Sequence, residues 1–272
     1  MICGDCGMVF AAPMPSAADL ADYNSGYFTA AHGGRPNSPV ALAFFSGMAN
    51  IRRMFVNRFL KKHNVVVKSI LEVGPGPGYF ASAWLKVAPQ TLYYAIETDN
   101  SCHKLLSDMG VMLTNVMDAK SADLVIMSHV VEHVSDPVAF VRDATICLRA
   151  GGALFIEVPC QDWVHKTLDE PHILFFDRLP LQRMLSELGF THIEISYYGK
   201  SISQLRSRSI LNSALTKIRG KLLQWNLAPL FAFNKSDTGL SNSLEHAVVA
   251  PFKPHIESLE PAWWLRAIAI KA

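Results

Sequence analysis

The 272-residue sequence contains no run of 18 or more uninterrupted apolar residues, although half of its residues are apolar. A helix needs a run of about that length to cross a bilayer, so we expect no membrane span. The first 20 residues lack a basic segment followed by an apolar one, so we also expect no signal peptide. The apolar half of the chain therefore predicts the core of a globular protein.

Cysteine and net charge are scarce as well. The five cysteines are an odd number, and only Cys3 and Cys6 lie close together. This pattern does not fit a disulfide framework and favours a reducing cytoplasm. The net charge is only +2, and the chain as a whole has no basic bias, so we expect no nucleic-acid partner.

From residue 68 onward, apolar strands alternate with segments of helical periodicity. Repeated units of this kind predict a doubly wound, Rossmann-like α/β fold with a mostly parallel sheet. Asp136 and Pro137 predict the start of one helix, which we expect to end at Gly151 and Gly152; Asn100 or Ser101 is the expected cap of another. The predicted strands are residues 70–73, 92–96, 111–113, 122–127, 153–158, 192–197 and 264–270.

The chain divides into four predicted segments. Residues 1–67 form an N-terminal extension with one long helix at about 39–63. Residues 68–199 form the core, and 263–272 form its last strand. Residues 200–262 are too long for an ordinary connection between two strands, so they predict a helical insertion with a function of its own.

The most informative stretch is residues 68–78, where an apolar strand ends in Glu72 and a glycine-rich turn follows. Glycine lets the backbone approach a bound ligand closely, and open α/β sheets bind ligands at the carboxyl ends of their strands. A dinucleotide fold favours the spacing G-x-G-x-x-G, whereas Gly74, Gly76 and Gly78 follow G-x-G-x-G, and Tyr79 stands where the third glycine of that motif would be.

Four motifs in order resemble those of class I S-adenosylmethionine-dependent methyltransferases, over about residues 68–198 and the final strand. They are Leu71-Glu72-Val73-Gly74-Pro75-Gly76-Pro77-Gly78, then Ala122-Asp123-Leu124-Val125, then Val131-Glu132-His133-Val134-x-Asp136-Pro137, and then Leu148-x-x-Gly151-Gly152 running on to Val158-Pro159. The resemblance implies a seven-stranded sheet with an antiparallel last strand, and S-adenosylmethionine as the cofactor.

The resemblance also implies where that cofactor binds. The glycine turn would admit its amino-acid end, and an acid after the second strand would accept hydrogen bonds from the ribose hydroxyls. The loop after the third strand would border adenine, and the residues after the fourth would flank the sulfonium. The expected cofactor-binding residues are Glu72, Gly74, Gly76, Gly78, Tyr79, Glu97, Thr98, Met117, Asp118, Ser128 and His129.

Residues 129–133 spell H-x-x-E-H, a zinc motif of inverted metalloproteases. Zinc binding of that kind needs both histidines on one helical face and a third ligand, whereas His129 directly follows a buried strand. The methyltransferase pattern already accounts for Glu132 and His133. Some small-RNA 2′-O-methyltransferases hold a divalent ion with Glu and His from this region, but this sequence does not reveal a complete ligand set. We therefore expect no metal.

Transfer to a hydroxyl or an acidic carbon benefits from a base, and histidine suits neutral pH. The candidates near the carboxyl edge of the sheet are His129, His133 and His172. Glu170-Pro171-His172-x-x-Phe175-Phe176 resembles a Glu-His-x-x-Tyr-Phe segment of sugar C-methyltransferases, in which the histidine is a proposed base. Phe175 departs from that pattern at the tyrosine position. We select His172 as the principal candidate, with a histidine held within its loop as the structural alternative.

The N-terminus resembles half of a zinc ribbon that many sugar-modifying methyltransferases carry, because Cys3-Gly-Asp-Cys6-Gly7 supplies one of two cysteine pairs. A structural zinc site needs four ligands, so we interpret this pair as a remnant or as the product of a miscalled start codon. The following Tyr23-x-x-x-Tyr27-Phe28 continues the resemblance and would line the acceptor pocket or form part of the core.

Residues 200–235 carry seven basic residues and no acidic residue, and the apolar residues at helical spacing are Leu211, Leu215, Ile218, Leu222 and Trp225. This pattern predicts a cationic amphipathic helix. It could form a lid over the acceptor site, bind a phosphorylated or nucleotide-linked substrate, touch an anionic membrane surface weakly, or pack on the core with a solvated basic face.

The sequence thus predicts methyl transfer from S-adenosylmethionine to a small-molecule acceptor, such as a sugar or another metabolite. Two other functions stay open: a non-catalytic binding module that keeps the cofactor fold, and a nicotinamide-dependent enzyme, because dinucleotide enzymes also place an acid where Glu97 stands.

Overall fold

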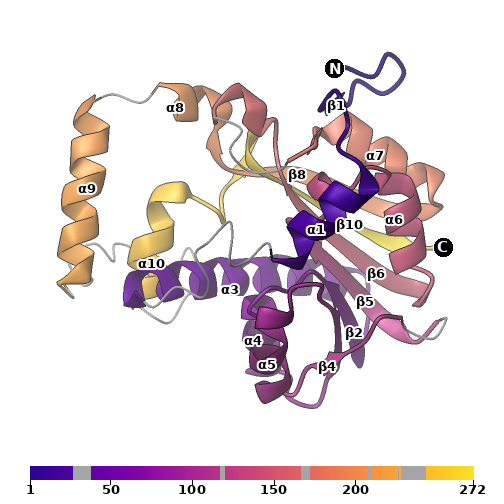
Figure 1. Ribbon diagram of the computed structural model, residues 1–272. Coiled ribbons are helices and arrows are strands. Elements are labelled where there is room, and N and C mark those ends of the chain that lie inside the picture. The colour runs from indigo at the N-terminus through magenta and orange to yellow at the C-terminus, as the bar shows by residue number, and fades with distance from the viewer. Residues whose placement is uncertain (27–37, 117–119, 167–171, 208–209, 226, 228–242) are drawn as a thin grey trace.

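In the computed structural model, an eight-stranded sheet lies between two layers of helices (Figure 1). The structure describes residues 1–26, 38–116, 120–166, 172–207, 210–225, 227 and 243–272. The strands are β1 (Val9–Phe10), β2 (Ser69–Val73), β3 (Leu92–Ile96), β4 (Met112–Leu113), β5 (Ala122–Ser128), β6 (Leu148–Pro159), β7 (Leu174–Phe175), β8 (Phe190–Ser201), β9 (Glu257–Ser258) and β10 (Ala262–Lys271).

The helices follow the expected alternation with these strands. The α-helices are α1 (Ala17–Ser25), α3 (Pro39–Lys62), α4 (Tyr79–Leu85), α5 (Asn100–Asp108), α6 (Pro137–Ala144), α7 (Arg178–Glu187), α8 (Ile202–Arg206), α9 (Ile210–Gln224) and α10 (Ser243–Val249). The described residues also include three short 3-10 helices, which are η1 (Val131–His133), η2 (Asp162–Val164) and η4 (Ala250–Phe252). None of the helices in the described ranges is long and apolar enough to span a membrane.

The sheet order is β4-β3-β2-β5-β6-β10-β8-β9. The strands from β4 to β6 pair in parallel, and β10 pairs antiparallel with both β6 and β8. The mostly parallel sheet with an antiparallel last strand is therefore confirmed. The predicted number of seven strands is too low by one, because the two-residue strand β9 pairs with the outer edge of β8. A strand this short leaves no apolar periodicity in the sequence.

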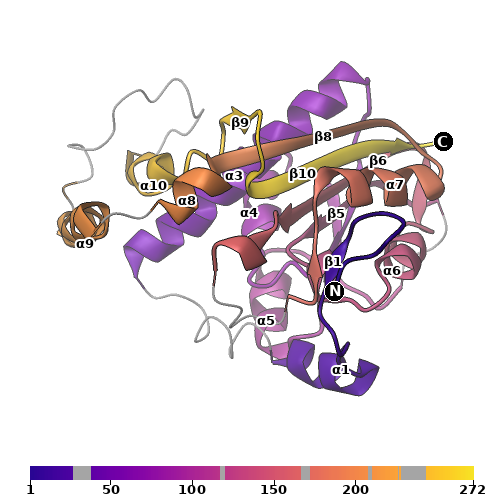
Figure 2. The ribbon, with the colours of Figure 1, turned by 90° about the horizontal axis from the view of Figure 1, so that it is seen from above.

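The two faces of the sheet are buried by different helices. Residues of α3, α4 and α5 form one apolar cluster with one face, and residues of α6 and α7 form a second cluster with the other. The long helix α3 runs along the sheet, as the view from above shows (Figure 2). Its first half also packs against α10 of the segment between β8 and β10, whereas α9 lies at the periphery (Figure 1).

Several predicted boundaries are wrong. The helix that starts at Asp136 ends at Ala144, and Gly151 and Gly152 lie inside β6. The apolar residue Leu148, which matches the helical spacing, is the first residue of that strand. The cap of α5 is Asp99, whose side chain accepts a hydrogen bond from the Ser101 backbone N–H. Asn100 and Ser101 are therefore the first helical residues.

The predicted apolar face of the cationic helix is only partly correct. The helix exists as α9, but Ile218 and the following Trp225 are exposed, and the buried residue of this segment is Leu223. Leu223 contacts the core through neighbours on α3 and α10, which the spacing within the helix cannot reveal. The side chains of residues 210–216, and with them Leu211 and Leu215, lie outside the described part.

Candidate active site

The chain order changes direction in the sheet between β2 and β5. From β2 it proceeds outward through β3 and β4, and then returns to the other side of β2 with β5 and β6. The two loops at such a switch point leave the sheet in opposite directions, so a crevice opens at the carboxyl ends of the two strands. The glycine turn follows β2, and His129 follows β5, so the sequence places its candidate cofactor residues on both sides of this crevice.

The glycine turn has the backbone that its sequence requires. Gly74, Gly76 and Gly78 have φ angles of 66°, 53° and 79°, a region that other residues enter only with strain. Packing adds a second reason for glycine, because a Cβ at Gly74 would lie 2.6 Å from the Val130 side chain. At Gly78, it would lie 2.4 Å from the side chain of Met109, the C-cap of α5, and 2.8 Å from that of Leu106 on the same helix. The turn therefore serves both close helix packing and backbone access.

Glu97 follows β3 and lies against the glycine turn. Its carboxylate accepts hydrogen bonds from the backbone N–H groups of Gly76 and Asp99, both at 2.8 Å. Burial raises the pKa of Glu97, although these hydrogen bonds oppose the rise. The neighbouring Thr98 donates a hydrogen bond to the carbonyl of Asn24 at 3.3 Å, which holds the end of α1 beside this loop.

Glu72 stands one residue before the end of β2 and is fully enclosed. Its carboxylate accepts a hydrogen bond of 2.6 Å from the Tyr93 hydroxyl. Burial raises the pKa of Glu72 to about 7, and the Tyr93 hydrogen bond and the charge of Arg52 reduce the effect only in part. The charged form of Glu72 is therefore costly in this protein without a ligand, which identifies the position as a functional candidate.

Three further candidates lie around the same crevice. The ring of Tyr79, at the start of α4, stacks on Phe45 of α3 with centroids 5.1 Å apart. The Ser128 hydroxyl is buried and has no hydrogen-bond partner among the described residues. His129 has a φ of 56°, and its backbone N–H donates to the carbonyl of Glu157 at 2.8 Å. This strained, left-handed backbone conformation ends the extended path of β5 at His129.

The His129 side chain joins a buried charge network that the sequence did not reveal. Its Nε2 lies 3.2 Å from Glu157, and its Nδ1 lies 3.4 Å from Glu132. Burial alone would lower the pKa of His129, but these two carboxylates raise it to about 9. Glu157 in turn pairs at 2.5 Å with both Arg52 and Arg266. Although burial opposes it, these two arginines hold the pKa of Glu157 well below its usual range.

His172, the principal candidate base, is paired with an acid that the sequence did not single out. Its Nδ1 lies 2.5 Å from the Asp162 carboxylate, and both side chains are buried. Burial favours the neutral acid, but the hydrogen bond with His172 keeps the pKa of Asp162 below its usual value. An ionised Asp162 accepts a hydrogen bond from Nδ1–H, and in that tautomer Nε2 carries the lone pair that can accept a proton or bind a metal.

The three candidate histidines lie around Glu132. Glu132 and His133 lie on η1, whereas His129 precedes it, so the two histidines of the H-x-x-E-H pattern do not share one helix. The rings of His133 and His172 are 4.9 Å apart in an edge-on arrangement. Ligand atoms of Glu132, His133 and His172 all lie within 4.8 Å of one another, so these residues could hold a metal ion. In such a site His172 would be the third ligand, which the sequence could not identify.

The remaining predicted residues are not placed. Met117 and Asp118, the expected adenine neighbours, fall outside the described residues, as do Tyr27 and Phe28. The first two residues of the segment that resembles sugar C-methyltransferases, Glu170 and Pro171, fall outside them as well.

A methyltransferase-domain family matches residues 48–195, which is more than half of the chain. The chain belongs to this family. The match begins within α3 and ends within β8, and it includes the glycine turn, Glu97 and all three candidate histidines.

Curated relatives of this methyltransferase-domain protein carry names that state the same cofactor. Two strains of Mycobacterium tuberculosis each have a probable S-adenosylmethionine-dependent methyltransferase that is 25% identical over 175 residues, covering 56% of this chain. The chain spans 63% of the length of these relatives. These names agree with the prediction of S-adenosylmethionine as the cofactor.

Solved structures with the same fold include two complexes of the plantazolicin methyltransferase BpumL. One holds a pentazolic and the other a monoazolic desmethyl analogue of plantazolicin, each together with S-adenosylhomocysteine. The TM-scores are 0.53 and 0.51, with 12% and 13% sequence identity. The alignments cover 93% and 94% of this chain and 97% and 90% of those chains. This similarity confirms the predicted fold and carries no information about the acceptor.

Proposed function

We propose that this protein transfers a methyl group from S-adenosylmethionine to a small-molecule acceptor. The observation that supports this most directly is the convergence of the glycine turn, Glu97 and the orphan Ser128 hydroxyl on the switch point of the sheet. The cofactor, when bound, supplies an activated methyl group on a positively charged sulfur. The chain's own residues then have to bind and orient the cofactor and the acceptor, and to remove a proton from the acceptor.

Each of these tasks has a candidate. The Glu97 carboxylate can exchange its contacts with the turn for ribose hydroxyls, and the turn itself can receive the amino-acid end of the cofactor. His172, oriented by Asp162, would take the proton of the acceptor at Nε2 as the acceptor atom forms its bond to the methyl carbon. The cofactor would supply the methyl group, and its sulfur would retain the electron pair of the methyl–sulfur bond. His129 and His133 would line the same site.

The acceptor we favour is a sugar or a similar metabolite. The resemblance of the segment around His172 to sugar C-methyltransferases supports this choice, and so does the N-terminal cysteine pair. In the structure that pair belongs to a tight turn, in which the Cys3 N–H donates to the Met8 carbonyl at 2.8 Å. The adjoining strand β1 pairs with β7 two residues after His172, so the N-terminal segment lies beside the proposed base.

Incubation with S-adenosylmethionine carrying a labelled methyl group, together with a panel of sugars and nucleotide-linked sugars, tests the proposal. We expect S-adenosylhomocysteine to form only when an acceptor is present. A non-catalytic binding module would bind the cofactor without any turnover on the panel. A nicotinamide-dependent enzyme would instead show a thermal shift with the dinucleotide and none with S-adenosylmethionine.

The position of the ribose can be tested separately. Glu97→Ala is expected to weaken cofactor binding at least tenfold, because charged hydrogen-bond acceptors to ribose contribute about 1.5–3 kcal/mol each. Titration calorimetry measures the change, and Glu187→Ala, an exposed acid on α7, is the control. Unchanged affinity of the Glu97 variant would place the ribose elsewhere.

A further inference from the structure

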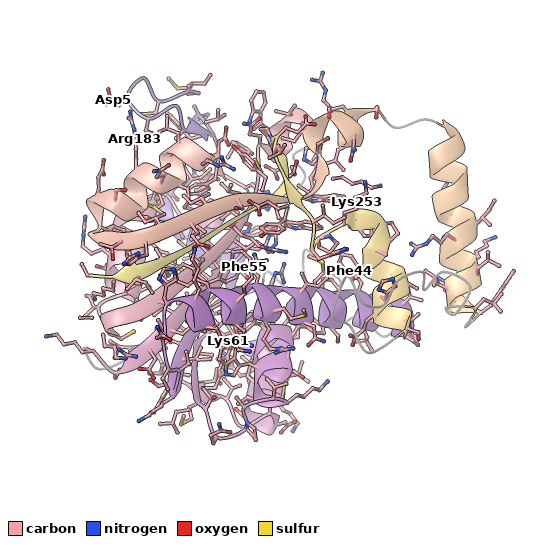
Figure 3. The ribbon with its side chains drawn as sticks, turned by 180° about the vertical axis from the view of Figure 1, so that it is seen from behind. Asp5, Phe44, Phe55, Lys61, Arg183 and Lys253 are labelled. Carbon is pink, nitrogen blue, oxygen red and sulfur yellow. The ribbon has the colours of Figure 1, made fainter. Side chains whose placement is uncertain are left out.

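A cavity lies between α3 and the strands β8 and β10, on the far side of β6 from the glycine turn. Its volume is about 270 Å³. Its apolar side is formed by Ile51, Met54 and Phe55 of α3, and its polar side by Arg58, Tyr198, His255 and Arg266. Figure 3 shows Phe55 where α3 passes beneath these strands. Because β5 and β6 lie between β2 and β10, the strand β10 beside this cavity is about 14 Å from β2, the strand that the glycine turn follows.

The cavity has positive groups and no acid in its lining. Arg58 makes no ion pair among the described residues, and its nearest polar contact is the Tyr198 hydroxyl at 3.1 Å. Arg266 is completely buried and shares its acid, Glu157, with Arg52 and His129. His129 also faces Glu132, but Arg52 and Arg266 share the single carboxylate of Glu157, so these four pairs leave one positive charge without an acid of its own. A buried excess of positive charge is costly unless an anion compensates it.

Hydrogen-bond donors remain available on this lining. Arg266 donates to Glu157 through Nε and to the Pro254 carbonyl through Nη1 at 2.8 Å, but its buried Nη2 has no partner in the described part of the chain. The Tyr198 hydroxyl accepts from Arg58, so its own proton can be donated elsewhere. A planar guanidinium is suited to two-point contact with an oxyanion. The Arg266 guanidinium is also held rigidly, 4.5 Å from the Tyr198 ring.

We propose that this cavity binds the oxyanion group of a small ligand, a phosphoryl or carboxylate group, between Arg58 and Arg266. The volume is below the roughly 300–1,000 Å³ of pockets that hold whole drug-sized ligands, so the cavity takes an anionic group and not a complete nucleotide. Arg58, Tyr198 and Nη2 of Arg266 donate to the anion, and the apolar residues of α3 exclude water from one side. The inference concerns binding alone and does not depend on methyl transfer.

Calorimetry of the full chain at constant ionic strength, with inorganic phosphate in one arm and acetate in the other, tests this site. Saturable binding of one anion per chain is expected. Arg58→Gln should weaken it at least tenfold, and Tyr198→Phe several-fold. The matched control is Lys61→Gln, which removes one exposed positive charge from the same helix (Figure 3) and should leave the affinity unchanged. The arm with the tighter binding identifies the phosphoryl or the carboxylate group as the ligand.

Arg266 is unsuitable for substitution, because removing one partner of a buried ion pair destabilises the fold strongly. Arg58→Gln and Tyr198→Phe should retain cofactor affinity, which serves as the check of folding. A crystal soaked with tungstate, an electron-dense oxyanion, should show a peak between Arg58 and Arg266. The proposal is overturned if neither anion binds, if Lys61→Gln weakens binding as much as Arg58→Gln does, or if the tungstate lies elsewhere.

Discussion

Burial disfavours the ionised form of Glu72. Its pKa of about 7 lies above the ordinary value of a glutamate, so the folded state binds a proton that the unfolded chain releases. Stability in the absence of ligand must then fall as the pH rises from about 4.5 through about 7, and stay low above that range. The ionised form of Glu72 therefore weakens the fold at neutral and alkaline pH.

We therefore expect Glu72→Gln to stabilise the protein by about 2 kcal/mol at pH 8, and by little at pH 4.5, because it removes the cost of ionisation. The Tyr93 hydroxyl can still donate to the amide oxygen. The same change should weaken cofactor binding. Thermal denaturation at the two pH values measures the first effect and calorimetry the second. A variant less stable than the wild type at pH 8 would contradict this account of Glu72.

Asp162 is expected to act as a positioning residue for His172. Asp162→Asn should lower kcat about tenfold to a hundredfold, because the imidazole loses the partner that fixes its tautomer, and His172→Ala should lower it further. Cofactor affinity should stay unchanged in both variants, and the pH dependence of kcat should change in Asp162→Asn. Asp143→Asn, an exposed acid on α6, is the control. Normal turnover of the His172 variant would show that another group, or no base, is used.

At this scale the sequence could select single residues but not their partners. Glu97 could be selected because it follows a predicted strand, and His172 because its segment follows another and resembles that of sugar C-methyltransferases. Asp162 could not, because its pairing with His172 depends on the path of a loop in which the two residues are ten positions apart. Arg266 and Glu157 were read as parts of apolar strands, and only the antiparallel register of β10 with β6 places them opposite each other.

Among the elements, η1 and the segment before β7 are brought together by one backbone hydrogen bond, from the Ile173 N–H to the Glu132 carbonyl at 3.0 Å. This contact sets His172 beside Glu132 and His133. The same three side chains can serve either as a base with its neighbours or as the ligands of a divalent ion, since two histidines and a carboxylate are common ligands of zinc and iron.

We expect dialysis against a chelator to change turnover by less than twofold, because the proposed reaction uses Nε2 of His172 as the base. The assay should be repeated with a Cys3→Ser, Cys6→Ser double variant, so that metal held by the N-terminal thiolates does not confuse the result. A loss of activity of tenfold or more that Zn²⁺ or Mn²⁺ restores would assign His172 to a metal ion instead.

Element types followed from periodicity, and their ends depended on tertiary contacts. The strands from β2 to β5 and the start of α6 were predicted to within a few residues, because their apolar spacing and caps are local signals. The structure of residues 145–152 was predicted wrongly, because Leu148 fits a helical spacing with α6. In the structure Leu148 pairs with Ala122 of β5. Pairing between distant strands decided that boundary.

The whole molecule depends on β10, which fills the gap between β6 and β8. It pairs with β6 over residues 264–270 and with β8 over 262–271. A chain that ends at residue 261 should lose its cooperative thermal transition and most of its soluble yield, because both neighbouring strands would expose unpaired edges. A chain that lacks only residue 272, which lies after the strand, is the control. A cooperative melt of the shorter chain within a few degrees of the wild type would contradict this.

This central position of the last strand has a consequence for biosynthesis. The ribosome makes every other strand of the sheet first, so β8 emerges without its neighbour and β6 keeps one open edge until translation reaches residue 262. Domains form as their segments emerge, and unpaired edges are prone to aggregation during that interval. The nascent protein is therefore expected to need the protection of a chaperone until the codons for β10 have been read.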